Sequence, residues 1–164
     1  MTRTFTESLL RQFTNSWNLY QQAINKVDEF NWFQFSFQNS ENYWGYALTL
    51  YHILETTEFY FRNNPEGMEW GKRGNIQWDN IDELKTSIKT LTKDLIIEYK
   101  SDIQQSVLLV LQNMTDSQLL EQDDFTWFPS IFEKLIYLLR HNLMHLGEIN
   151  KYLRDRSLPR LSWE

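Results

Sequence analysis

The residues best suited to chemistry are three histidines, His52, His141 and His145, and the chain has no further histidine and no cysteine. Because cysteine is absent, these imidazoles are the only nitrogen ligands available to a soft or borderline metal ion. His141 and His145 are four residues apart, within about 40° of each other around a helix, so they share one face. The sequence therefore points to a metal site that this pair forms with His52.

Glu148 extends the same face, since His141, His145 and Glu148 stand at i, i+4 and i+7. Three roles fit it: an additional ligand, an acceptor that orients an imidazole N–H, or a general base. The alternative is a solvated carboxylate that pairs with Lys151 or Tyr152. We take Glu148 as the candidate catalytic residue.

His52 falls within a mostly apolar helical pattern, where a buried, unpaired imidazole would be costly. A metal or a hydrogen-bonded network would remove that cost, and a hydrogen-bonded core histidine is the alternative to a ligand. Glu55, one turn further on, has the same readings as Glu148. Its place near the polar side of the helix makes it the weaker candidate.

The elements that must position these residues are helical. Apolar residues recur at three-four spacing over four segments, which predicts four long helices. Their expected ranges are 6–27, 40–62, 81–114 and 130–156. Together they predict an all-α protein, an up-down four-helix bundle, with residues 1–164 forming a single domain.

The sequence also predicts where the helices begin and what joins them. Ser40 is a good N-cap for the second helix, and the long third pattern has room for a bend or break near 100–101. Asp79 opens that third helix, and Pro129 sits where the last one starts. Residues 28–39 read as an ordered connection, with a short strand at 33–37 as the alternative.

Composition excludes several classes of function. The net charge is −6 and no dense basic stretch occurs, which argues against a nucleic-acid partner. No segment approaches the roughly 20 apolar residues of a membrane span, and the first residues lack the features of a signal peptide. We therefore expect a cytoplasmic protein that does not bind membranes. Aromatic residues make up 16% of the chain, which suits a core of large side chains or a pocket with aromatic walls.

Residues 140–149, RHNLMHLGEI, followed by Tyr152-Leu153-Arg154, resemble the last-helix motif of the DinB/YfiT-like family, roughly HxxxHxGQ and then YLR. Residues 44–55 resemble the helix that carries that family's first histidine. The resemblance extends over essentially the whole chain in helix order and motif position. It implies a four-helix bundle, often dimeric, with zinc or nickel held by three histidines that correspond to His52, His141 and His145.

The same resemblance implies a metal-dependent enzyme acting on small molecules. Characterised relatives include transferases or isomerases that use low-molecular-weight thiols such as bacillithiol, and others resemble hydrolases. Two departures put a shared substrate in doubt: Glu148 replaces the motif glutamine, and Met144 stands where relatives often carry another histidine. Transfer of a thiol to an electrophile, metal-dependent hydrolysis, and a non-catalytic metal-stabilised binding protein are the competing functions.

Overall fold

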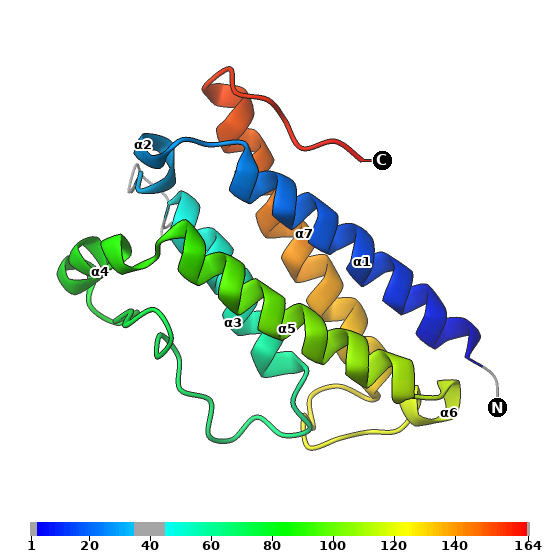
Figure 1. Cartoon of the computed structure of the whole chain (residues 1–164). Coiled ribbons are helices and arrows are strands. Elements are labelled where there is room, and N and C mark those ends of the chain that lie inside the picture. The colour runs from blue at the N-terminus through cyan, green and yellow to red at the C-terminus, as the bar shows by residue number, and fades with distance from the viewer. Residues whose placement is uncertain (1–2, 35–44, 164) are drawn as a thin grey trace.

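The computed structural model describes residues 3–34 and 45–163, and all regular structure in these ranges is helical (Figure 1). The long helices are α1 Thr4–Asn25, α3 Tyr46–Tyr60, α5 Lys93–Asn113 and α7 Ile131–Asp155. The short ones are α2 Glu29–Trp32, α4 Ile81–Ser87, the 3-10 turn η1 Ile88–Thr90, and α6 Asp116–Leu119. The predicted all-α class is confirmed for the described residues. Among these residues, no helix is both long enough and apolar enough to cross a membrane.

The four long helices pack so that each contacts two of the others: α1 and α3 both lie against α5 and α7. Helices α1 and α7 run in one direction and α3 and α5 in the other (Figure 1). The prediction that direction alternates along the chain is therefore wrong between α3 and α5. Residues 61–92 carry the chain back from the end of α3 to the level of its start, and parallel neighbours require a crossover of this kind.

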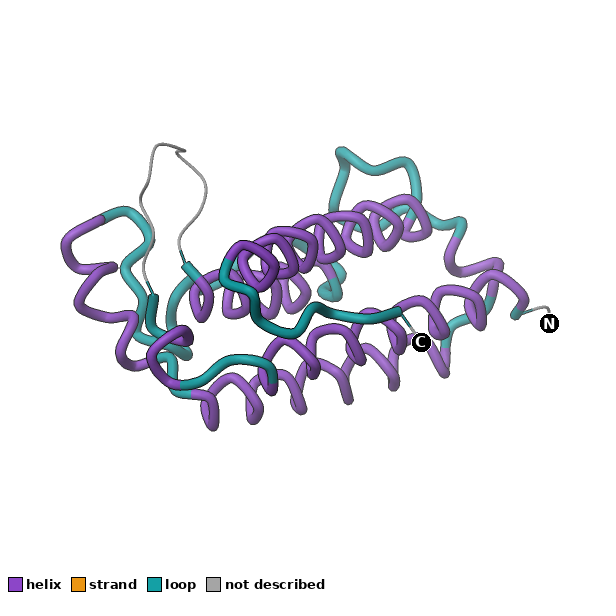
Figure 2. The backbone as a smooth tube through the Cα atoms, turned by 90° about the horizontal axis from the view of Figure 1, so that it is seen from above, coloured by secondary structure: helices purple, strands orange, loops and turns teal. Residues whose placement is uncertain are grey.

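Hydrogen bonds from distant segments hold both the start of α1 and the C-terminal tail in place. Asp116, at the start of α6, accepts hydrogen bonds from the backbone N–H groups of Phe5 and Thr6 at 3.1 and 3.0 Å. It thereby satisfies N–H groups in the first turn of α1 that have no partner within the helix. The C-terminal tail turns back beside the long helices (Figure 2), where Ser162 N–H donates to Gln22 Oε1 at 3.0 Å.

The predicted third helix, 81–114, consists of α4 and η1, then a break at Leu91–Thr92, and then α5. The predicted bend or break near 100–101 does not occur, since these residues lie inside α5. Thr92 has extended backbone, and its hydroxyl accepts from the N–H of Leu95 at 3.2 Å, so it caps α5. The carbonyl of Leu91 accepts from the indole of Trp32 at 2.6 Å. Local capping and this tertiary bond outweigh the continuous apolar pattern.

The other predicted boundaries differ by a few residues. Asn80, not Asp79, caps α4. The last helix begins as predicted, since Ser130 accepts from the N–H of Glu133 and caps α7. The expected N-cap Ser40 and residues 35–37 of the possible strand lie outside the described residues.

Helix α3 is buried almost all round, as its apolar composition predicts. From Tyr46 to Thr57 every residue is buried except His52, which is partly exposed. Two tyrosine hydroxyls bridge it to α1: Tyr20 donates to the carbonyl of Leu50 at 2.8 Å, and Tyr46 to that of Ala23 at 2.7 Å. The fold thus leaves one opening onto the middle of this helix, at a histidine.

Candidate metal centre

The three histidines converge although they come from two helices. The Nε2 atom of His141 lies 3.2 Å from Nε2 of His52 on α3 and 3.2 Å from Nε2 of His145, one turn along α7. One ring nitrogen from each residue can be chosen so that all three lie within 4.8 Å of one another. The structure therefore brings together the three residues that the sequence identifies as ligands.

The spacing of these nitrogens suits a metal ion. Zinc binds imidazole nitrogen at about 2.0–2.1 Å in tetrahedral geometry, which places two ligand nitrogens about 3.3 Å apart. Both measured Nε2 separations, 3.2 Å, are close to that value. The residues present thus fit a divalent ion that takes three imidazole ligands.

Burial keeps two of these imidazoles neutral. Desolvation, followed by the neighbouring histidines His145 and His141, lowers the pKa of His52 to about 3. Desolvation and then the proximity of His145 lower the pKa of His141 to about 4. Near neutral pH both rings therefore offer lone pairs without first releasing a proton, as metal ligands must.

Glu148 lies on the outer side of the cluster. Its Oε2 atom is 2.7 Å from Nδ1 of His145, so the carboxylate accepts a hydrogen bond from that nitrogen and leaves Nε2 to face the other histidines. Lys151, an expected partner of a merely solvated Glu148, pairs instead with Asp155. Of the three roles predicted for Glu148, the geometry matches the acceptor that orients an imidazole.

Glu55 is placed quite differently from the prediction. It is only 1% exposed, and it accepts hydrogen bonds from the backbone N–H of Gly71 and, at 2.8 Å, from Nε1 of Trp78. The prediction that it lies near the polar side of its helix is wrong because the loop after α3 covers that side. Glu55 fixes the loop next to the histidines and does not join their cluster.

Gly71 is required where it meets Glu55. Its φ is +80°, and a Cβ there would lie 1.9 Å from the carbonyl oxygen of Ile76. The N–H of Ile76 closes the turn by donating to Gly71 at 2.9 Å. Farther along the turn, the N–H of Gly74 donates to the hydroxyl of Tyr51 on α3 at 2.9 Å. Two side chains of α3 thus hold this loop in place.

Aromatic rings surround the histidines. Trp78 meets His52 edge to face, with ring centroids 6.0 Å apart, and Tyr137 stacks on His141 at 6.3 Å. The aromatic content of the sequence was compatible with a core of large side chains or with a pocket that has aromatic walls, and it named no residue for either. Tyr137 stands one helical turn before His141, so the i, i+4 spacing could have identified it; Trp78 is brought in only by the loop.

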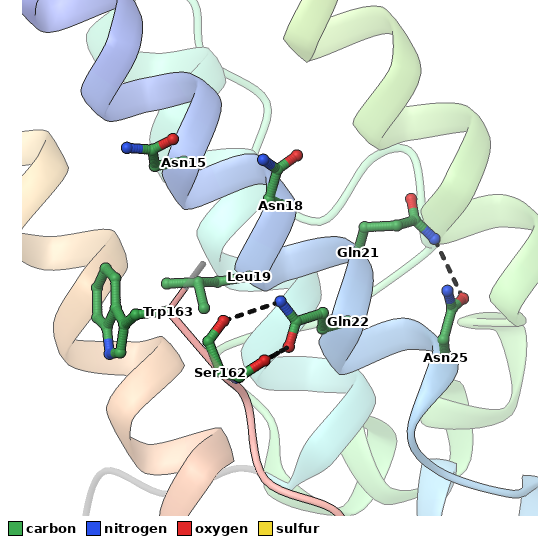
Figure 3. Close-up of a pocket in the computed structure, with 8 residues that line it drawn as sticks. All are labelled: Asn15, Asn18, Leu19, Gln21, Gln22, Asn25, Ser162 and Trp163. Carbon is green, nitrogen blue, oxygen red and sulfur yellow. Dashed lines mark hydrogen bonds between the residues drawn. The ribbon is translucent and has the colours of Figure 1, made fainter.

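A cleft of about 400 Å³ opens beside His52. A second hollow, of about 250 Å³, lies between α1 and the C-terminal tail (Figure 3). Its lining consists of amide side chains with a leucine, a serine and a tryptophan: Asn15, Asn18, Leu19, Gln21, Gln22, Asn25, Ser162 and Trp163. It offers hydrogen-bonding groups but no imidazole or carboxylate, so it lacks the side chains of a metal or acid–base site.

We expect Glu55→Gln to lower the free energy of unfolding by about 1–3 kcal/mol, because the amide nitrogen would oppose one of the two N–H donors and leave it unsatisfied. Urea denaturation measures the change, and faster hydrogen exchange at the Gly71 amide would report the loosened loop. The matched control is Glu98→Gln on the exposed face of α5, expected to stay within about 0.5 kcal/mol of the parent. Equal stability of the two variants would contradict the anchoring role.

We expect the metal-free protein to lose stability as the pH falls from 7 to 5. The unfolded chain titrates its histidines near pH 6.5, whereas the folded pKa values of His52 and His141 are about 3 and about 4. The unfolded state therefore takes up protons first, and stability declines, by about 1–2 kcal/mol for His52 at pH 5. Denaturation in the presence of a chelator checks this. An equal decline in a His52→Gln, His141→Gln variant would refute it.

Comparison with known proteins adds no relative. No family model matches the chain, and neither a curated protein nor a solved structure matches it. The candidate centre is therefore supported by its own geometry, which meets the spacing, burial and outer-sphere hydrogen bonding of a three-histidine metal site.

Proposed function

We propose that the chain is a metal-dependent enzyme that holds a divalent ion, zinc or nickel, through His52, His141 and His145. The observation that carries the proposal is the convergence of three imidazole nitrogens, with Nε2 of His141 3.2 Å from Nε2 of each of the other two histidines and one ring nitrogen of each residue within 4.8 Å of the others. Glu148 supports it, because ligating histidines commonly donate their other ring N–H to a carboxylate. The proposed metal site also agrees with the resemblance to the DinB/YfiT-like family, and we propose that the four long helices form a bundle of that family's type.

Three protein ligands are typical of catalytic rather than structural zinc, since they leave a position for a small molecule. An ion in such a site lowers the pKa of a bound thiol or water. The partly exposed His52 lies at the cleft, which gives a small molecule access to the centre. We therefore assign activation of a small nucleophile as the task of the site.

The reaction that we favour is transfer of a low-molecular-weight thiol to an electrophilic small molecule. Because the chain contains no cysteine, the thiol must arrive as a cosubstrate. Glu148 keeps the proton on Nδ1 of His145, so that Nε2 faces the centre. Metal-dependent hydrolysis of a small substrate is the second candidate, and it would use the same three histidines.

We expect the tag-free protein to contain about one equivalent of divalent metal per chain, as measured by elemental analysis after purification. A His141→Ala, His145→Ala variant should lose it, because one remaining imidazole cannot hold the ion. Glu148→Gln should retain the site but bind metal about 10–100-fold more weakly, because the outer acceptor is weakened. Sub-stoichiometric metal in the parent, unchanged in the double variant, would overturn the proposal.

We expect turnover of electrophilic substrates only when a thiol is supplied. The measurement is consumption of a panel of electrophiles by metal-loaded protein with and without an added low-molecular-weight thiol, with His52→Ala as the inactive control. Turnover without thiol would favour hydrolysis instead. Full metal occupancy without turnover in either condition would identify a non-catalytic metal-binding protein.

A further inference from the structure

The cleft beside His52 has a composition of its own. It is lined by His52 and by five residues from the loop that Glu55 anchors, namely Trp70, Ile76, Gln77, Trp78 and Asp79. Its volume of about 400 Å³ falls in the range of small-molecule pockets. Because His52 belongs both to the cleft and to the histidine cluster, a molecule that occupies the cleft lies directly against the proposed metal site.

One wall of the cleft is rigid. Trp78 donates its indole N–H to Glu55 at 2.8 Å, stacks on Tyr51 with centroids 6.2 Å apart, and meets the ring of His52 at 6.0 Å. These three contacts oppose displacement of the Trp78 side chain when a ligand arrives. It therefore offers a preformed aromatic surface, which lowers the entropic cost of binding.

The other indole of the cleft is only partly covered. Trp70 contacts Phe59 with centroids 5.2 Å apart, and Phe59 in turn contacts Phe125 at 5.1 Å. Trp70 nevertheless remains 45% exposed. Stacking between aromatic rings contributes beyond the apolar area that it buries, so an aromatic ring in the cleft is a better occupant than an aliphatic chain of the same size.

The charged residues of the cleft lining indicate which charge a bound ligand can carry. Asp79 is the one ionisable residue besides His52 in the lining, and no lysine or arginine belongs to it. Beside Asp79, a carboxylate or phosphate on the ligand would therefore meet a like charge with no lysine or arginine to offset it, whereas a neutral or cationic ring meets no such penalty there.

We propose that this cleft binds a neutral or cationic aromatic group of the substrate, with Trp70 and Trp78 as its walls and Asp79 selecting against anions. The assignment rests on the proposed function, since it places that group beside the metal ligand His52. It adds a substrate class to a site whose ligands alone do not define one.

The test uses full-length protein loaded with Co²⁺, whose thiolate charge-transfer absorption reports thiols that reach the metal. The probes are benzyl mercaptan and cyclohexylmethanethiol, which both carry sulfur on a saturated carbon attached to a six-membered ring and differ in whether that ring is aromatic. We expect benzyl mercaptan to bind about tenfold more tightly. Trp70→Ala should remove most of that difference, while Trp127→Ala, which truncates another exposed tryptophan outside the cleft lining, should preserve it.

A third probe, 4-(mercaptomethyl)benzoate, tests the charge selection. It should bind more weakly than benzyl mercaptan, and Asp79→Asn should restore its affinity more than Asp82→Asn, which neutralises an exposed carboxylate outside the cleft. Equal affinities of the cobalt protein for all three thiols, or an aromatic preference that survives Trp70→Ala, would overturn the substrate class alone. Failure of Co²⁺ to bind would overturn the metal site and the substrate class together.

Discussion

The arrangement depends on a shortage of protons among three converging imidazoles, of which His145 is buried and His52 and His141 are partly buried. A neutral imidazole carries one N–H, and in His145 that proton lies on Nδ1, facing Glu148 at 2.7 Å. Its Nε2 therefore presents a lone pair to Nε2 of His141, which must also satisfy Nε2 of His52, both at 3.2 Å. Desolvation opposes protonation of His52 and His141, whose pKa values it lowers. A cation that accepts all three lone pairs resolves the conflict better than any sharing of the remaining protons.

Three of the four residues of this centre could be predicted from the sequence because they lie on one helix, α7. The i, i+4, i+7 spacing of His141, His145 and Glu148 fixes their common face whatever surrounds α7, and Ser130 marks where that helix begins. His52 is harder, since its approach depends on how α3 packs against α7. Its partly apolar surroundings made it a candidate, but only the tertiary structure brings its Nε2 within 3.2 Å of His141.

The failures have a common physical cause, namely interactions that a helical pattern does not contain. Glu55 was placed near the polar side of its helix because the helical pattern takes account of that helix alone. In the structure, Gly71 and Trp78 from the following loop cover this side and donate hydrogen bonds to the Glu55 carboxylate. The apolar period continued through Thr92, whose hydroxyl nevertheless caps a new helix. Helix direction also depends on a crossover, 61–92, whose course no periodicity specifies.

The two carboxylates near the cluster bear on the choice between thiol transfer and hydrolysis. Both oxygens of Glu55 accept protein N–H groups, and Oε2 of Glu148 is engaged with His145. Of these two residues, only Oε1 of Glu148 is left to act as a general base, and the cleft lining adds one further carboxylate, that of Asp79. A thiol, with an ordinary pKa near 8.5, needs far less help to ionise than water does. A centre with good metal ligands and a scarce base is accordingly better matched to a thiol nucleophile than to water.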